Sequence, residues 1–391
     1  MIDVTRARAL TPGAEHQAYF YSCGAGLMPR PVLDAVHGHL DLEARIGGYA
    51  AEEQAAPATE AAYDAIACLI NCHRDEVAIV ENATVAWCQA FYGLAQDFKP
   101  GDRVLTVVAE YASNFIALLQ TVRRRGIVVD VIPNDGDGQA DLEALEALID
   151  DDVKLIAVTH VPTSGGLVSP AAQIGAIARR HGIPYLLDAC QSAGQLPLDV
   201  AELGCDFLSA TGRKFLRGPR GTGFLYAGKA IMQRCEPPVL DLHSAVWTAP
   251  DTYEMRPDAR RYENWENNVA GKIGLGVAVE HALSWGLENI AARNAELSGD
   301  LLSRLGAIPG VTLRDAGRRQ CAIVTFSHDR LAPQEIAAAL AGQAIAIGTS
   351  SRSSTLIDFQ ARNLPPLCRA AVHYHNTEEE VAWLAAAVAA L

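Results

Sequence analysis

The segment from residue 77 to residue 227 alternates short apolar runs with longer runs of helical period, and this alternation constrains the fold most strongly. The apolar runs predict strands at 77–81, 103–108, 128–132, 155–161, 184–188, 207–210 and 223–227. The runs between them predict helices at 84–96, 111–125, 139–149 and 170–181. Such a pattern is typical of an α/β fold with a mixed, mostly parallel sheet covered by helices on both faces.

Polar residues stand where these predicted strands end. Ligands of open α/β sheets bind outside the carboxyl ends of the strands. The residues at or just past such ends are Asn82, Glu110, His160, Asp188 and Lys214. Although they are spread over more than 130 positions, we expect them to meet in one cleft.

The whole sequence predicts an N-terminal arm and two domains. Residues 1–18 are interpreted as an N-terminal arm, 19–260 as a large domain and 261–391 as a smaller C-terminal α+β domain. Two helices are predicted near the start, at 31–44 and 57–70, and 228–268 is predicted to be irregular. The C-terminal part predicts one long helix at 271–305, strands at 321–327, 344–348 and 369–374, a helix at 333–341 and a capping box of Thr377 with Glu380.

Composition and charge exclude several classes of partner. The chain has 391 residues, of which 50% are hydrophobic and 20% charged, with a net charge of −14. An acidic chain is a poor partner for nucleic acid or an anionic membrane. No apolar run approaches the ~20 residues that span a bilayer, and the N-terminus lacks the apolar core of a signal peptide, so we expect a cytoplasmic protein. The nine cysteines include no C-x-x-C pair, and His373 with His375 lacks a third ligand at suitable spacing, so no metal site is expected.

The stretch from Cys205 to Leu225 presents one lysine between two strand-like runs. An apolar run ends in Ala210-Thr211-Gly212-Arg213-Lys214, and a glycine-rich turn follows. A lysine taken out of water loses its proton more easily, which suits imine formation with an aldehyde cofactor. Taken alone, Lys214 would be read as a solvated loop residue. Asp188, at the abrupt end of an upstream strand, changes that weighting because it can pair with a protonated pyridine nitrogen.

This stretch resembles the pyridoxal-phosphate attachment signature of the class V aminotransferase family, which includes cysteine desulfurases, selenocysteine lyases, C–S lyases and isopenicillin N epimerase-like proteins. The resemblance extends from Tyr21 to the C-terminus. It implies a fold-type I, pyridoxal-phosphate-dependent enzyme that acts on an amino acid and forms a homodimer.

The resemblance also implies residues for the cofactor. Lys214 would form the imine and move protons, and Asp188 would hold the pyridinium proton. Gln191 would lie near the phenolic oxygen, and Tyr111 would stack on the ring where desulfurases carry a histidine. The phosphate would be bound by Ala83, Thr84, Thr211 and Arg213, with Asn267 as a further candidate.

For the substrate, Arg369 matches the family's carboxylate-binding arginine. Thr163 occupies the place of an asparagine that assists it, and the loop at Gly24 would pass close to the substrate. Arg352 and Ser354 complete the predicted substrate-binding set. An ordinary turn at Gly24, a surface ion pair for Arg369 and a solvated Arg352 are the alternative interpretations.

Two departures from the family's pattern bear on the reaction. The segment 348–355, where desulfurases carry a nucleophilic cysteine, contains none. Glu266 stands where the family commonly has a threonine that reaches the partner's phosphate, so Asn267 is expected to substitute or Arg213 to compensate.

These observations favour a β-eliminating C–S or C–Se lyase acting on a cysteine derivative. An epimerase or an aminotransferase, working from the same deprotonated substrate, is the first alternative. A non-catalytic binding protein that keeps the fold is the second. The sequence leaves the amino-acid substrate and the choice among these reactions open.

Overall fold

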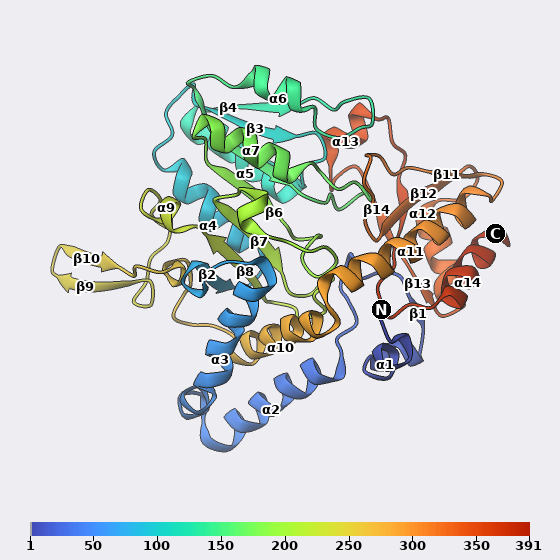
Figure 1. Ribbon diagram of the computed structural model, residues 1–391, viewed down its shortest axis with the longest axis horizontal. Coiled ribbons are helices and arrows are strands. Elements are labelled where there is room, and N and C mark those ends of the chain that lie inside the picture. The colour runs from blue at the N-terminus through green and yellow to red at the C-terminus, as the bar shows by residue number, and fades with distance from the viewer. Residues whose placement is uncertain (1) are drawn as a thin grey trace.

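The central element is a seven-stranded sheet with the strand order β2-β8-β7-β6-β5-β3-β4. The computed structural model describes residues 2–391. Only β8 runs antiparallel to its neighbours; the other strands are parallel to one another, as Figure 1 shows. The strands are β2 (Val77–Val80), β3 (Arg103–Val107), β4 (Val128–Ile132), β5 (Val153–Thr159), β6 (Tyr185–Asp188), β7 (Phe207–Thr211) and β8 (Gly223–Ala227).

Helices cover both faces of this sheet because its strands are apolar on both sides. Tyr185 and Leu187 of β6 belong to one core cluster, whereas Leu186 between them belongs to another. The first cluster includes residues of α3 (Gly48–Ile70), α7 (Ala171–His181) and α10 (Val269–Trp285), and the second includes residues of α4 (Ala83–Ala95) and α5 (Ala112–Arg125). Alternate side chains thus enter opposite layers. The remaining helices of this region are α6 (Leu142–Leu148), α8 (Val200–Leu203) and α9 (Lys229–Met232). The predicted α/β class is confirmed.

A second, four-stranded antiparallel sheet lies in the C-terminal part, with the order β11-β12-β15-β14. Its strands are β11 (Val311–Leu313), β12 (Ile323–His328), β14 (Gly348–Ser350) and β15 (Leu367–Ala371). They accompany the helices α11 (Leu287–Gly306), α12 (Pro333–Ala341), α13 (Leu356–Ala361) and α14 (Glu378–Ala389). Thr377 and Glu380 form the predicted capping box of α14.

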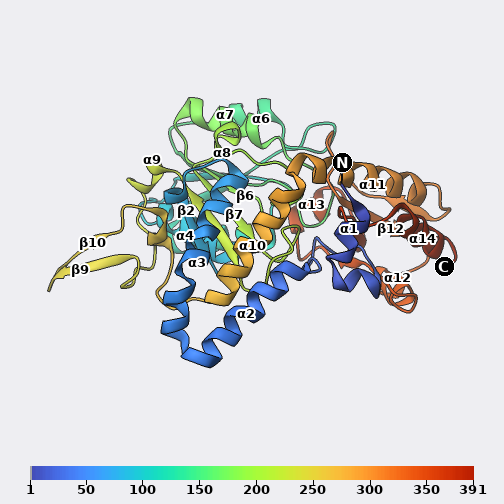
Figure 2. The ribbon, with the colours of Figure 1, turned by 60° about the horizontal axis from the view of Figure 1, so that its bottom comes forward.

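The N-terminal residues are tied to this C-terminal part. Figures 1 and 2 show α1 (Val4–Ala9) close to the C-terminal elements. The 3₁₀ turn η1 (Pro12–Glu15) follows, and β1 (Ala18–Tyr19) pairs in parallel with β13 (Ile345–Ala346). The helix α2 (Arg30–Ile46) packs against α3 and α10. The predicted N-terminal arm thus contains the helix α1 and the turn η1; its limits and those of the other two domains stay a prediction.

Three predicted elements differ from the structure. The segment 228–268 contains a projecting hairpin of β9 (Ala245–Ala249) and β10 (Thr252–Met255), visible in Figure 2, and the 3₁₀ turn η3 (Ala259–Tyr262). The predicted helix 271–305 is two helices, separated at Gly286, whose φ of +81° favours glycine. The last predicted strand ends at Ala371, so His373 and His375 lie in a buried loop and not on a strand face. Among residues 2–391, no helix combines the length and the apolar character needed to cross a membrane.

Candidate active site

Lys214 lies just past the end of β7, buried at 7% exposure. The loop at Gly24 and Gly26 crosses its backbone: the Gly26 N–H donates to the Arg213 carbonyl at 2.7 Å. A Cβ at Gly26 would lie 2.5 Å from the Lys214 carbonyl oxygen, so only glycine permits this approach. The N-terminal loop therefore helps to enclose the lysine.

Arg217 fixes the turn that follows the lysine. It is fully buried, and its φ of +61° is unusual for a residue with a side chain. Its guanidinium donates to the Leu27 carbonyl at 2.7 Å, the Tyr374 hydroxyl at 2.6 Å and the Thr11 hydroxyl at 2.6 Å. These bonds tie the lysine-bearing turn to the N-terminal segment and to the C-terminal part.

Asp188 ends β6 and is buried at 4% exposure. Its Oδ2 accepts a hydrogen bond from Asn114 Nδ2 at 2.8 Å, and its Oδ1 accepts one from the Cys190 N–H at 2.8 Å. Burial raises the pKa of this carboxyl, whereas the two hydrogen bonds and the charge of Lys214 act in the opposite direction. The charge of Lys214 therefore reaches the Asp188 carboxyl, whereas the predicted role of Asp188 toward a ring nitrogen stays a prediction.

A second group of polar residues joins the two sheets. Gln191 Nε2 donates to the Cys23 carbonyl at 3.1 Å and to the Thr163 hydroxyl at 3.3 Å. Arg369, on β15 of the smaller sheet, donates to the Thr163 carbonyl at 2.5 Å and to its hydroxyl at 2.7 Å. The Arg369 guanidinium also lies 5.5 Å from the centre of the Tyr21 ring. Arg369, Thr163, Gln191 and the Gly24 loop are thus brought together.

The predicted phosphate-binding residues lie along one edge of the sheet. Asn82 caps α4, so Ala83 and Thr84 form its first turn, with Ala83 buried and Thr84 exposed. Gly223 pairs with Val80 on one side and with Thr211 on the other, which places Thr211 beside this helix start. The Thr211 hydroxyl donates to the Thr222 carbonyl at 3.3 Å.

The remaining predicted residues are less closely joined to this group. Arg213 bonds to the Gly24 carbonyl through its guanidinium. Tyr111 is half-buried at the start of α5, where the Ser354 carbonyl accepts from the Ala112 N–H at 2.9 Å. Asn267 folds back on the Trp265 carbonyl at 3.1 Å, beside a small hollow that Glu81, Thr222 and Glu266 also line. Arg352 is exposed and makes no hydrogen bond or ion pair with the described residues.

The sequence missed two residues of this site, Asn114 and Cys190, and gave Glu110 no role. The Asn114 amide donates hydrogen bonds to both Asp188 and Glu110. Glu110 is buried and directly follows the turn at 108–109 after β3. Cys190 follows Asp188 by two positions; burial raises the pKa of its thiol, and the charge of Lys214 opposes that shift. The spacing of Glu110 and Asn114, four positions apart across a helix start, was the available signal.

A family model described as aminotransferase class-V matches residues 18–384. The chain belongs to the class V aminotransferase family. A probable cysteine desulfurase of Methanothermobacter thermautotrophicus is 29% identical over 338 residues, which cover 86% of this chain and 84% of that protein. The apo structure of a cysteine desulfurase from Thermococcus onnurineus NA1 is similar with a TM-score of 0.92 and 25% identity, covering 100% of this chain and 98% of that one. A complex of the cystine C–S lyase C-DES with cysteine persulfide is similar with a TM-score of 0.86 and 26% identity, covering 97% and 99%.

As a class V aminotransferase-family protein, the chain is a pyridoxal-phosphate-dependent enzyme of fold-type I. The described residues fit this cofactor. Two buried polar atoms at the junction of the sheets, Gln191 Oε1 and Arg369 Nε, have no hydrogen-bond partner among the described residues. Unpaired buried polar atoms are costly, and a bound polar molecule would relieve that cost. The buried Lys214, whose charge acts on the buried Asp188 carboxyl, completes the set.

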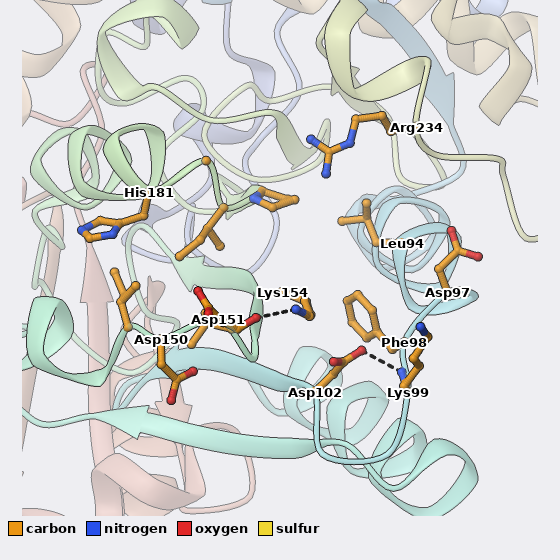
Figure 3. Close-up of a pocket in the computed structure, with 15 residues that line it drawn as sticks. Leu94, Asp97, Phe98, Lys99, Asp102, Asp150, Asp151, Lys154, His181 and Arg234 are labelled. Carbon is orange, nitrogen blue, oxygen red and sulfur yellow. Dashed lines mark hydrogen bonds between the residues drawn. The ribbon is translucent and has the colours of Figure 1, made fainter.

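A hollow of about 760 Å³ lies at the opposite, amino ends of the strands. Figure 3 shows Asp97, Asp102, Asp150, Asp151, Lys154, His181 and Arg234 around it, and Lys214 and Asp188 do not line it. Most of its polar residues are exposed and bond locally, as Lys154 does with the Asp151 carbonyl at 2.5 Å. The size of a hollow therefore does not identify the active site of this family member.

Proposed function

We propose that the protein is a C–S lyase that releases the β-substituent of a cysteine derivative. The observation that carries this proposal is the absence of an ionisable thiol where sulfur would be accepted. The segment 348–355 beside Arg369 contains no cysteine, and its Ser350 hydroxyl bonds to the Ser164 hydroxyl at 2.6 Å.

The two thiols near Lys214 do not replace that missing cysteine. Burial raises the pKa of both Cys23 and Cys190, although the charge of Lys214 partly opposes the shift in each case. Because the thiolate is the nucleophilic form, neither group is prepared to attack substrate sulfur. Elimination needs no such nucleophile, and the similar C-DES structure is that of a cystine C–S lyase.

The residues proposed to hold the cofactor follow from the placements above. Lys214 would bind its aldehyde carbon, Asp188 its ring nitrogen and Gln191 its phenolic oxygen, with Tyr111 against the ring. The first turn of α4 at Ala83 and Thr84, together with Thr211 and Arg213, would receive the phosphate, and Asn267 is a further candidate. When bound, pyridoxal phosphate supplies an electron sink for the bond broken at the substrate α-carbon.

The chain's own residues then bind the substrate and move its protons. Arg369 would bind the α-carboxylate; Thr163, which accepts from the Arg369 guanidinium, orients it. With the substrate bound, Lys214 Nζ is released from the aldehyde carbon and would take the proton from the α-carbon. The electron pair of that C–H bond forms a Cα=Cβ double bond as the C–S bond breaks with its own pair on sulfur, and the lysine ammonium returns a proton to the leaving sulfur. Burial of Lys214 excludes water from this transfer. Gly24, Ser354 and Arg352 would line the substrate's path.

We also infer that the protein works as a homodimer. The Asn267 Oδ1 is buried and has no partner among the described residues, and Trp265 next to it is 51% exposed. A second copy packed at this edge would cover the tryptophan and complete the amide's hydrogen bonds. Light scattering of the eluting protein measures the mass directly, and a 41.7 kDa species at all concentrations would contradict the inference.

The experiment that tests the lyase proposal mixes purified holoenzyme with cystine, cysteine, S-alkylcysteines, selenocysteine and alanine. We expect pyruvate and the released sulfur or selenium product in equal amounts from at least one of the first four substrates, and no pyruvate from alanine. Exchange or inversion at the α-carbon without pyruvate would replace the proposal with an epimerase. Transfer of the amino group to an added keto acid would replace it with an aminotransferase. Unaltered cofactor absorbance with every amino acid would indicate a binding protein.

A further inference from the structure

The Glu110 carboxylate lies at the carboxyl end of the seven-stranded sheet and is buried at 4% exposure. Its Oε1 accepts from the Tyr111 N–H at 2.9 Å, the Asn114 amide at 2.8 Å and the Thr159 hydroxyl at 2.5 Å. Its Oε2 accepts from the Thr106 hydroxyl at 3.0 Å and the Thr159 N–H at 3.1 Å. None of these five donors is a cation, which is unusual for a buried carboxylate.

Asn114 connects this carboxylate to Asp188. Its Nδ2 donates to Glu110 Oε1 and to Asp188 Oδ2, each at 2.8 Å. Only the amide nitrogen can serve both acids, because the amide oxygen would face two acceptors. Asn114 itself is buried at 2% exposure. The Asn114 amide nitrogen therefore donates to two carboxylates, one that follows β3 and one that ends β6.

The two acids are also coupled by charge. Burial raises the pKa of Glu110 to about 7, the hydrogen bonds from Thr159 and Asn114 oppose this, and the Asp188 charge adds to it. Other groups surround the pair: Lys214 acts on Asp188, and Tyr185 on β6 is influenced by Glu110. His160, whose N–H donates to the Asp188 carbonyl at 2.9 Å, is buried and uncharged near neutral pH because burial lowers its pKa to about 4.

We propose that Glu110 is a positioning residue for the cofactor, holding the Asp188 carboxylate through Asn114 in the orientation and charge state that bind the ring nitrogen. The inference rests on Asp188 facing that nitrogen, as proposed above, but not on which reaction follows. A buried carboxylate without a positively charged partner is not required to end a strand. The hydrogen bonds through Asn114 to Asp188 give Glu110 a role in the site.

Replacing Glu110 by glutamine removes its charge and leaves its hydrogen-bond donors mismatched in either amide orientation. With its oxygen toward Asn114, the new amide nitrogen faces the Thr159 N–H. With its nitrogen toward Asn114, two donors oppose each other and Asn114 is pushed from Asp188. One buried donor is left unpaired in both cases. Thr106→Val is the matched control, because it removes a hydrogen bond from the other Glu110 oxygen and leaves Asn114 between the two acids.

The experiment measures the dissociation constant of pyridoxal phosphate and the pH titration of the imine absorbance in the wild type, Glu110→Gln, Asn114→Ala, Thr106→Val and Asp188→Ala, and in Asp188→Ala with Glu110→Gln. We expect Glu110→Gln and Asn114→Ala to weaken cofactor binding roughly 10- to 100-fold, as loss of a hydrogen bond to a charged group does. Glu110→Gln also removes a negative charge near the cationic imine, so its titration midpoint falls to lower pH. Thr106→Val leaves Asn114 between the two acids, so it changes the dissociation constant less than about twofold.

The double variant separates positioning from simple packing. If Glu110 acts through Asp188, Glu110→Gln changes the dissociation constant less than about twofold once Asp188 is alanine. Equal effects in both backgrounds, or an unchanged midpoint in Glu110→Gln, would overturn the inference. An imine band that is absent from the wild type itself would instead overturn the cofactor assignment to Lys214. Melting of the cofactor-free proteins shows whether a variant has lost its fold, and Asn114→Leu, which is similar in size and cannot donate, repeats the test where alanine unfolds.

Discussion

The two ends of the seven-stranded sheet use the same ionisable residue types in opposite ways. At the carboxyl ends, Lys214, Asp188 and Glu110 are buried, and the two carboxylates accept hydrogen bonds from backbone or neutral groups. At the amino ends, the polar residues around the hollow of Figure 3 are mostly exposed, and Asp150 pairs with Arg103 at 2.6 Å. Buried charges without a direct ion pair among the described residues mark the end where we propose the active site, although the amino ends hold the hollow of about 760 Å³.

The largest contrast is expected between two lysines. Lys214→Ala removes the buried amine and should lower kcat by at least about 1,000-fold, because both imine formation and proton transfer depend on it. Lys154→Ala, at the opposite end, should leave kcat within about twofold, since among residues 2–391 Lys154 bonds only to the Asp151 carbonyl. Steady-state pyruvate formation and the visible imine band measure both. Equal losses of kcat in the two variants would contradict the assignment of the chemistry to the carboxyl ends of the strands.

A smaller contrast is expected between two arginines. Arg369→Gln keeps polarity at a buried position but loses the charge, so kcat/KM should fall roughly 100-fold, chiefly through KM, as expected for a lost charged hydrogen bond. Arg234→Gln alters an exposed arginine beside the hollow and should change neither constant. Measurement of kcat and KM separately tests this. An unchanged KM in Arg369→Gln would contradict its proposed role toward the carboxylate.

The position of the proposed site at the carboxyl ends was predictable because its residues follow strands that are apolar on both faces. Asp188 and Lys214 were found in this way, and the two core clusters explain the continuous apolar runs. Asn114 was missed because it lies within a helix, where its polar side chain reads as solvent-facing. The bond that gives it a role comes from a residue 74 positions away in sequence.

The projecting hairpin of β9 and β10 could not be predicted because its side chains are exposed. Val246 and Trp247 of β9 and Tyr253 of β10 are exposed, so the hairpin has no buried face to impose an apolar period of two. The break at Gly286 depends on one left-handed residue inside a run that is otherwise helical. Thr163 and Gln191 meet Arg369 only because two sheets pack together, which strand patterns do not specify.

The pH dependence of stability should also differ between the two ends. His160 is buried, and its folded pKa of about 4 lies below the usual value of 6.5, so the unfolded chain binds more protons between these values. The stability it contributes is present above pH 6.5 and is lost as the pH falls toward 4. Between pH 7 and pH 5, wild-type protein should lose roughly 2 kcal/mol more unfolding free energy than His160→Gln.

Urea unfolding of the cofactor-free proteins at the two pH values measures this difference. His181→Gln is the control, because His181 lies exposed beside Glu146 at the amino ends. Its loss between the two pH values should match that of the wild type to within about 0.5 kcal/mol. A wild-type-like loss in His160→Gln would mean that the buried imidazole is not held neutral in the folded protein.

The smallest effect is expected from the ion pair at the amino ends. Asp150→Asn removes the charge that pairs with Arg103, but the asparagine oxygen can still accept from the Asp152 N–H. The Asp150 side chain is 54% exposed, and Arg103 keeps its second partner, Asp130, at 2.8 Å. The free energy of unfolding should therefore fall by less than about 1 kcal/mol, with kcat and KM unchanged. We assign no chemistry to the amino ends of the strands. A change in kcat in Asp150→Asn would therefore contradict the assignment of the active site to the carboxyl ends directly, whereas a loss of activity at the carboxyl ends only supports it.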